Sequence, residues 1–182
     1  MTNSALLVMD VQTDIVQRHP ADPGYLQRIN VAIAAARKID VPVIYVVVGF
    51  RAGHPEISPR NKAFSVASSS GRLVQTDAVN AVHDAVAPAP GDVVVTKRRV
   101  SAFTGSDLEV VLRAKGIDEL VLCGIATSGV VLSTLRQAAD LDYGLVVLSD
   151  GCLDADEEVH RVLTEKVFPR QAEVMTIAEW AS

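Results

Sequence analysis

The stretch ELVLCGIATSGVVLSTLRQAAD, residues 119–140, contains a short apolar run, a turn of small residues and a pattern typical of a helix. Its apolar residues are continuous rather than alternating, which indicates a strand covered on both faces, as in a parallel sheet. In α/β enzymes a strand–turn–helix junction is a common place for a nucleophile. Here the turn offers only the hydroxyl groups of Thr127 and Ser128, followed by Gly129 and Val130. Any catalytic residues of this chain are therefore expected outside this turn as well.

The same order of elements recurs along the chain. Apolar runs also lie at residues 5–9, 41–48, 92–96 and 144–149, with a weaker one at 172–177, and helical patterns lie at 25–40, 107–118, 130–142 and 156–168. This alternation predicts right-handed crossovers and an α/β fold built on a doubly wound parallel sheet. Residues 49–73 carry Gly, Pro and Ser throughout. We expect them to form a long loop of the kind that serves as a lid or binding element.

Length and composition favour one globular domain over residues 1–182. A chain of 182 residues with 49% hydrophobic and 21% charged residues is large enough to bury a full core without disulfides or metals. Its net charge of −5 and aromatic content of 4% argue against nucleic acid and anionic membranes as partners, because these need basic patches or stacking platforms. We expect a small-molecule substrate instead.

Several familiar sites are missing from the sequence. The cysteines Cys123 and Cys152 form no C-x-x-C pair, which favours a reducing cytoplasm and structural thiols. The histidines lack metal-ligand spacing, and no dinucleotide, P-loop or nucleophile-elbow motif is present, so we expect no metal and no cofactor. No apolar run approaches the ~18–20 residues of a membrane span, and the first residues lack the basic start of a signal peptide.

Three candidate residues lie where strands of the predicted sheet end. In doubly wound sheets, ligands bind beyond the carboxyl ends of the strands near the topological switch point. Asp10 directly follows the first apolar run, Gln12 lies just beyond it, and Lys97 follows the run 92–96. A carboxylate there is unfavourable unless it is paired or used, and a nearby lysine would keep it ionised or share a proton with it. The alternatives are that Asp10 caps a turn and that Lys97 belongs to a solvated basic patch.

The long loop 49–73 supplies a second set of candidates. It holds Arg51 and Arg60, whose positive charge suits an acidic substrate, among other polar residues. A solvated loop explains the same residues equally well, because connecting segments run over the surface and are usually polar. The sequence leaves these two interpretations open.

The chain resembles the isochorismatase-like hydrolases, a family that includes isochorismatases, nicotinamidases and carbamoylsarcosine amidases. The resemblance rests on LLVMDVQTD (6–14), VVTKRRVSAFTGSDLEVVLRAKGIDELVLCGIATSGVVLSTLRQAAD (94–140) and LSDGC (148–152). It implies a six-stranded parallel sheet with helices on both faces and a catalytic site that contains Asp10 and Lys97. It further implies substrate contacts from the Lys-x-x-x-Ser-Ala-Phe element and from the turn, with the residues Phe103, Ala126, Thr127, Ser128 and Gly129.

The resemblance also implies that this chain lacks the nucleophilic cysteine of the family. In the amidase members a nucleophilic cysteine follows the Gly-x-x-Thr element at the start of the helix, and that position is Val130 here. Valine has no lone pair with which to attack, so a covalent amidase mechanism is not expected. The family also carries a cis peptide bond at this turn, which the alignment of motifs places between Ala126 and Thr127.

One branch of the family, the isochorismatases, works without that cysteine and uses the aspartate as general acid on an enol ether. We therefore expect Asp10 to be the general acid/base and Lys97 its electrostatic partner, acting on a small acidic metabolite, with enol ether hydrolysis favoured. Two alternatives remain: an amide hydrolase that uses an Asp-activated water, and a non-catalytic protein that keeps the pocket for binding. The resemblance also implies a homodimer or homotetramer.

Overall fold

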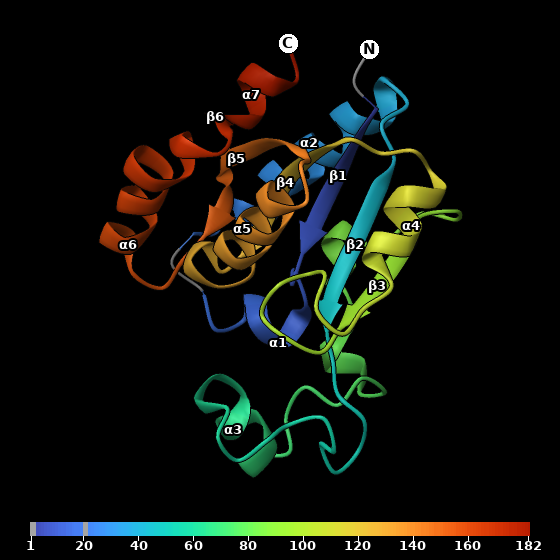
Figure 1. Ribbon diagram of the computed structural model, residues 1–182, viewed down its shortest axis with the longest axis vertical. Coiled ribbons are helices and arrows are strands. Elements are labelled where there is room, and N and C mark those ends of the chain that lie inside the picture. The colour runs from blue at the N-terminus through green and yellow to red at the C-terminus, as the bar shows by residue number, and fades with distance from the viewer. Residues whose placement is uncertain (1–2, 20–21) are drawn as a thin grey trace.

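The computed structural model describes residues 3–19 and 22–182. Six parallel strands form one sheet in the order β3-β2-β1-β4-β5-β6 (Figure 1). Their bounds are β1 (Ser4–Met9), β2 (Val43–Val48), β3 (Val93–Lys97), β4 (Glu119–Ile125), β5 (Gly144–Leu153) and β6 (Glu173–Met175). The predicted doubly wound six-stranded sheet is confirmed.

Helices cover both faces of this sheet. They are α1 (Thr13–Val16), α2 (Tyr25–Lys38), α3 (Lys62–Ser69), α4 (Leu108–Ala114), α5 (Leu132–Asp140), α6 (Glu157–Val162) and α7 (Ile177–Trp180). Apolar residues of α4 and α5 pack in one core cluster, and those of α2 and α7 pack in the other. Figure 1 shows α5 in front of the sheet and α2 behind it.

The central strand β1 shows why the sheet has two cores. Leu6 and Val8 belong to the cluster under α2, whereas Leu7 and Met9 belong to the cluster under α5. All four side chains are fully buried or nearly so, because successive side chains of a strand point to opposite faces. Each such burial stabilises the fold by roughly 1.5–3 kcal/mol. This explains why the sequence of β1 is continuously apolar up to Asp10.

The segment 49–73 is not the uninterrupted loop that the sequence predicts. It contains the helix α3, whose first turn is capped by the Asn61 side chain, which accepts a hydrogen bond from the Phe64 N–H. The rings of Phe50 and Phe64 pack edge to face at 5.1 Å, and they anchor the segment to the end of β2. In Figure 1 the segment with α3 projects beyond the carboxyl end of the sheet. The apolar pattern of this segment is too weak to indicate a helix, but asparagine is a residue typical of a helix N-cap.

Two helices begin or end differently from their predicted ranges. The helix expected from Val130 starts at Leu132, after a kinked turn at Thr127–Val131 whose Gly129 has non-helical angles. The helix expected over 156–168 is α6 followed by a π-helical turn at Leu163–Val167. The kinked turn follows β4 directly.

The strands β1 and β4 are neighbours in the sheet, although they are not consecutive in the chain. At their carboxyl ends, the backbones approach so closely that a Cβ on Gly124 would lie 2.2 Å from the Met9 carbonyl oxygen. Gly124 also has φ +148°, which favours glycine. There is therefore no room for a side chain at Gly124, where β1 and β4 meet at the switch point of the sheet. Over residues 3–19 and 22–182, no helix combines the length and the apolar character needed to cross a membrane.

Candidate active site

Asp10 and Lys97 form a buried ion pair at the carboxyl edge of the sheet. Asp10 directly follows β1 and Lys97 is the last residue of β3, and Oδ2 of Asp10 lies 2.9 Å from Nζ of Lys97. The two residues are 5% and 1% exposed. The ammonium group also donates to the Arg99 carbonyl at 3.0 Å. The structure thus brings together the two residues that the sequence singled out, across the intervening strand β2.

The two oxygens of Asp10 have different surroundings. Oδ2 is paired with Lys97, whereas Oδ1 is buried and has no hydrogen-bond partner among the residues that the structure describes. Burial raises the pKa of Asp10 above its ordinary value, although the charge and the hydrogen bond of Lys97, and to a lesser extent the backbone N–H of Val48, oppose that effect. Desolvation disfavours the charged form of a carboxyl group. Oδ1 is therefore the oxygen on which this site can hold or accept a proton.

Gln12 supports the strand ends and has no amide hydrogen left for a substrate. Its Nε2 donates to the carbonyls of Val48, at 3.0 Å, and Asn80, and its Oε1 accepts from the Val48 N–H at 2.8 Å. The side chain is fully buried. Both donors of the amide are already used, and a substrate contact from Gln12 stays a prediction. Gln12 instead ties the chain beyond β1 to the end of β2.

The turn after β4 has a closed hydrogen-bond pattern. The peptide bond between Ile125 and Ala126 is cis, one residue earlier than the motif comparison implied. The Ala126 carbonyl accepts hydrogen bonds from the N–H groups of Gly129, at 3.0 Å, and Val131, at 3.3 Å. Ser128 is exposed at the surface of the turn, whereas Thr127 is fully buried. Of the turn residues expected at the site, Thr127 points into the protein.

The buried Thr127 has a histidine partner that sequence reasoning missed. Its Oγ1 lies 2.8 Å from Nδ1 of His160, a residue of α6. The neighbouring Ser128 N–H donates to Oδ2 of Asp154, which follows β5, at 2.7 Å. The available signal was the position of His160 near the start of the helix after β5, because β5 runs parallel to β4 and beside it. Parallel neighbours place the elements that follow them at one edge of the sheet.

Val130 lies in the core rather than at an open position. It is 2% exposed and shares a cluster with Phe103, which is also buried. The backbone beside Phe103 is fixed to α5, because the Ala102 N–H donates to Oγ1 of Thr134 at 3.0 Å. The link between the element after β3 and the helix after β4 therefore keeps Val130 and Phe103 enclosed. A substrate contact from Phe103 stays a prediction.

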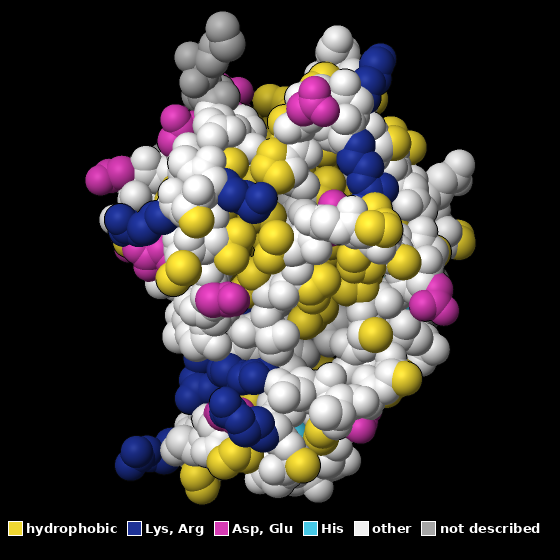
Figure 2. Space-filling model, turned by 90° about the vertical axis from the view of Figure 1, so that its right-hand side faces the viewer, with side chains coloured by type: hydrophobic (Ala, Val, Ile, Leu, Met, Phe, Trp, Pro, Cys, Tyr) yellow, Lys and Arg dark blue, Asp and Glu magenta, His cyan; other side chains and the backbone are white. Residues whose placement is uncertain are grey.

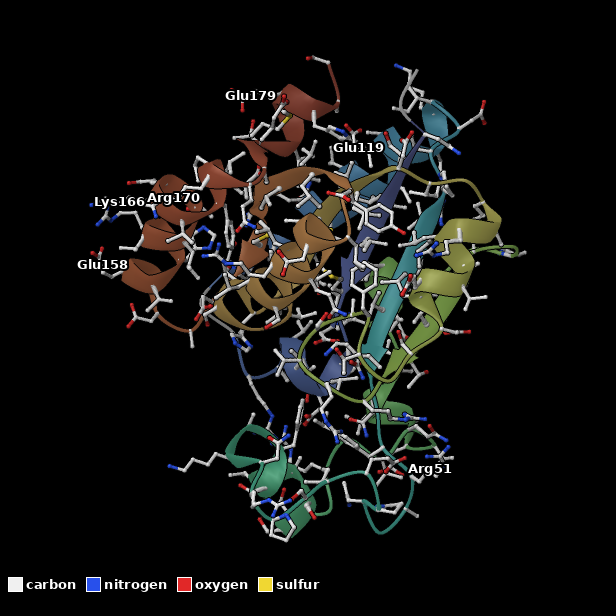
Figure 3. All side chains as sticks on the ribbon, in the orientation of Figure 1. Arg51, Glu119, Glu158, Lys166, Arg170 and Glu179 are labelled. Carbon is white, nitrogen blue, oxygen red and sulfur yellow. The ribbon has the colours of Figure 1, made fainter. Side chains whose placement is uncertain are left out.

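The two loop arginines lie on the segment that carries α3. Arg51 pairs with Glu56 at 2.6 Å, and its side chain is largely exposed (Figure 3). Arg60 is exposed as well. Figure 2 shows that Lys and Arg side chains gather at this end of the molecule, and Glu56 is the one carboxylate within residues 49–73. Contact of Arg51 or Arg60 with a substrate stays a prediction.

Both cysteines are buried within the protein. Cys123 donates to the Leu7 carbonyl at 3.4 Å, and Cys152 lies on β5. Burial raises the pKa of the Cys123 thiol well above its usual range and raises that of Cys152 to about 12. A thiol in this state is a poor nucleophile, because the thiolate is the reactive form.

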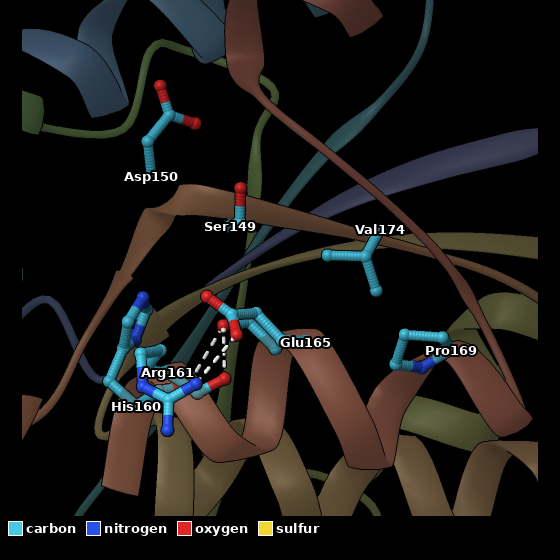
Figure 4. Close-up of a pocket in the computed structure, with 8 residues that line it drawn as sticks. Ser149, Asp150, His160, Arg161, Glu165, Pro169 and Val174 are labelled. Atoms are coloured by element: carbon cyan, nitrogen blue, oxygen red, sulfur yellow. Dashed lines mark hydrogen bonds and ion pairs between the residues drawn. The ribbon is translucent and has the colours of Figure 1, made fainter. Parts of the chain in front are cut away.

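Two cavities lie beside β5 and α6, away from the ion pair. One of about 530 Å³ is lined by Ser149, Asp150, His160, Arg161, Thr164, Glu165, Pro169 and Val174 (Figure 4). A second of about 340 Å³ shares three of these residues and extends to Asp154 and to Asp22 and Arg28 near α2. Neither is lined by Asp10 or Lys97. His160 borders both cavities and also contacts the turn after β4.

Comparison with known proteins identifies the class of this fold and site. A model of the isochorismatase domain matches residues 4–179. The chain is 34% identical to the uncharacterized isochorismatase family protein YecD of Escherichia coli O157:H7, over 97% of this chain and 93% of that protein. This chain belongs to the isochorismatase family of hydrolases.

Two relatives with a stated activity are amide hydrolases. The chain is 34% identical to the ureidoacrylate amidohydrolase RutB of Stutzerimonas stutzeri, over 86% of this chain and 72% of that protein. It is similar in structure to a cysteine hydrolase from Pseudomonas syringae pv. phaseolicola, with a TM-score of 0.91 at 26% identity and with 98% and 91% of the chains covered. The N-carbamoylsarcosine amidase of Thermoplasma acidophilum gives a TM-score of 0.79 at 25% identity and covers 97% of each chain.

Proposed function

We propose that this protein hydrolyses a small acidic metabolite by acid/base catalysis at Asp10, without a covalent intermediate on the protein. The observation that supports this most is the buried Oδ1 of Asp10, which has no hydrogen-bond partner among the described residues. A raised pKa keeps part of the carboxyl population protonated at pH values where an exposed aspartate is fully charged. Lys97, at 2.9 Å from the other oxygen, orients the group and stabilises its charged form.

Enol ether hydrolysis fits a carboxyl group in this state. The Asp10 carboxylic acid gives its proton to the terminal vinyl carbon, and the electron pair of the C=C bond forms the new C–H bond. The resulting oxocarbenium ion takes up water at its cationic carbon and returns one proton to the Asp10 carboxylate. The hemiketal then collapses to a ketone and an alcohol. No nucleophile is needed at Val130.

The charge of the molecule supports an acidic substrate. Basic side chains gather at the end of the molecule that carries α3 (Figure 2). Arg51 and Arg60 belong to the segment that carries α3, and two further arginines directly follow Lys97. Localised positive potential attracts and retains anions. The net charge of the whole chain is −5, whereas the segment 49–73 has more basic than acidic residues and is positively charged.

Amide hydrolysis is the second candidate, because the relatives with a stated activity act on C–N bonds. In this reaction, the Asp10 carboxylate accepts a proton from water as the oxygen attacks the carbonyl carbon. The proton then passes to the leaving nitrogen, and the C–N bond breaks. The reaction uses the same Oδ1 as a base rather than as an acid.

The first experiment is a turnover assay of the purified protein with isochorismate, in which released pyruvate is measured. Ureidoacrylate and N-carbamoylsarcosine are assayed in parallel for loss of the C–N bond. We expect Asp10→Asn to lower turnover by at least about a hundredfold, because general acid–base catalysis contributes on this scale. Turnover unchanged in Asp10→Asn contradicts the proposal. Absence of turnover on enol ethers and amides, together with retained binding of a small acid, favours a binding protein.

Val130→Cys separates the two mechanisms. The substitution places a thiol at the position that the amidase members use for covalent attack. If the site keeps amidase geometry, the variant gains C–N hydrolysis. Alkylation of the new thiol with iodoacetamide then abolishes that activity. If the native chemistry is enol ether hydrolysis, Val130→Cys leaves pyruvate release within about threefold of the unmodified protein, because Val130 supplies only packing.

A further inference from the structure

The turn after β4 is held from outside by two side chains that belong to other elements. Nδ1 of His160, on α6, lies 2.8 Å from Oγ1 of Thr127. Oδ2 of Asp154, between β5 and α6, accepts from the Ser128 N–H at 2.7 Å. The two contacts hold consecutive residues, so they fix both the side chain and the backbone of the turn.

The same turn is held from inside by its own backbone. Gly129 and Val131 donate to the Ala126 carbonyl, and the turn leads directly into α5. Its shape therefore depends on two groups of contacts, and only the outer group requires specific side chains. Thr127 is fully buried, so without His160 its hydroxyl would stay in the interior with no hydrogen-bond partner among the described residues. A buried polar group that loses its partner is unfavourable.

We propose that His160 and Asp154 are positioning residues, which hold the turn at Thr127–Ser128 in the shape that the reaction at Asp10 uses. Neither residue touches the reacting atoms in this proposal. They act through Thr127 and through the Ser128 amide. The assignment of this turn to catalysis rests on the proposed function, whereas the mechanical link from α6 to the turn rests on the contacts alone.

The state of the histidine ring is part of this link. Burial lowers the pKa of His160, and the nearby Asp154 opposes that effect. Neutral imidazole has one donor and one acceptor nitrogen, so Nδ1 and the Thr127 hydroxyl can form this hydrogen bond in either direction. The other charged groups around the ring, which line the same cavities, are Asp150 on β5, Glu157, Arg161 and the following Glu165, and the pair Asp22–Arg28 from the α2 side.

The test compares Thr127→Val and His160→Leu with their double variant, using ¹⁵N amide spectra and hydrogen exchange of residues 128–130. We expect each single variant to move these resonances and to speed exchange, and the double variant to do no more than either one, because both remove the same contact. His160→Asn should restore the wild-type spectrum, since its amide can occupy the place of Nδ1. Arg161→Gln, on the same helix and the same cavity, is the matched control.

Turnover supplies the second readout. We expect His160→Leu and Thr127→Val to lower kcat by about tenfold with little change in KM, because small displacements of a site slow the reaction steeply. His160→Asn should recover most of that loss. Spectra of His160→Leu that match those of Arg161→Gln, or fully additive effects in the double variant, overturn the link. Coupled spectra with kcat unchanged show a link without a catalytic role and overturn the proposal. If Asp10→Asn retains turnover while Thr127→Val and His160→Leu remain coupled in spectra and kcat, the proposed function fails and the positioning role stands.

Discussion

At the carboxyl edge of the sheet, charged side chains are buried at one end and exposed to solvent at the other. At the β1–β3 end, Asp10 and Lys97 are paired inside the protein and almost no part of either reaches solvent. At the β5–α6 end, cavities open to the surface, and Arg161 forms ion pairs with the largely exposed Glu158 and Glu165. These two cavities and the buried ion pair are thus at different places. Desolvation, rather than hollow space, identifies the group that can do acid/base work.

The largest effect is expected from Lys97→Met, which leaves the Asp10 carboxyl without its partner. Breaking a buried pair in this way lowers the free energy of unfolding by about 3–5 kcal/mol. The loss should shrink as the pH falls, because protonation of Asp10 removes the uncompensated charge. Urea denaturation at about pH 5 and about pH 8 measures the difference. A loss that is equal at both pH values contradicts the idea that Asp10 is the unpaired charge.

Gln12→Leu is expected to have the next largest effect. The change keeps the approximate volume but leaves the Val48 N–H and the carbonyls of Val48 and Asn80 without their partner. Unpaired buried groups lower stability by about 1–3 kcal/mol each. We expect a loss of roughly 3 kcal/mol, measured by urea denaturation. Gln12→Glu at low pH, where the carboxyl is neutral, should be much milder. An equal loss in both variants would show that hydrogen bonding to Val48 is not what matters.

A smaller, pH-dependent effect is expected from His160. Its pKa is lower in the folded protein than the ordinary 6.5, so the unfolded chain takes up the proton first as the pH falls. The stability that this neutral ring contributes is therefore present above about pH 6.5 and is lost as the pH falls through the folded pKa. His160→Asn removes this dependence. Denaturation midpoints of both proteins between about pH 8 and pH 5 check the prediction, and parallel curves would refute it.

The smallest effect is expected from Arg161→Gln, on the exposed side of α6. It removes the pairs with Glu158 and Glu165, which lie in solvent, where ion pairs contribute little. We expect no measurable shift of the denaturation midpoint and no change in turnover. A clear loss of activity would show that the cavity of Figure 4 takes part in the function and would remove the contrast between the two ends of the edge.

The sheet was predictable because its strands are covered on both faces, which makes each one a continuous apolar run, as in β1 and β4. Asp10 and Lys97 were predictable for the same reason, since a charged residue directly after such a run has to be paired or used. The helix α3 was missed because its residues Lys62–Ser69 are mostly small. Its signal was the cap Asn61 rather than an apolar stripe.

The contacts of Gln12 and His160 were not predictable from their own sequence neighbourhoods. Gln12 has the residue type of a substrate contact, but its partners come from β2 and from Asn80, far along the chain. The partner of Thr127 lies on α6, and the contact exists because that helix packs beside the turn. Sequence pattern places a residue at an edge of the sheet, whereas the packing of distant elements decides what it touches there.

The backbone at Asp10 has a consequence for the history of the family. Its φ is +55°, a left-handed conformation that Gly, Asn and Asp adopt far more readily than other residues. A lineage that abandons the reaction is therefore not free to place any residue here. We expect inactive descendants to carry asparagine or glycine at this position, whereas an alanine or leucine would signal a rebuilt strand end. The residue at this position therefore shows whether such a protein lost only the catalytic carboxyl group or also the backbone conformation that holds it.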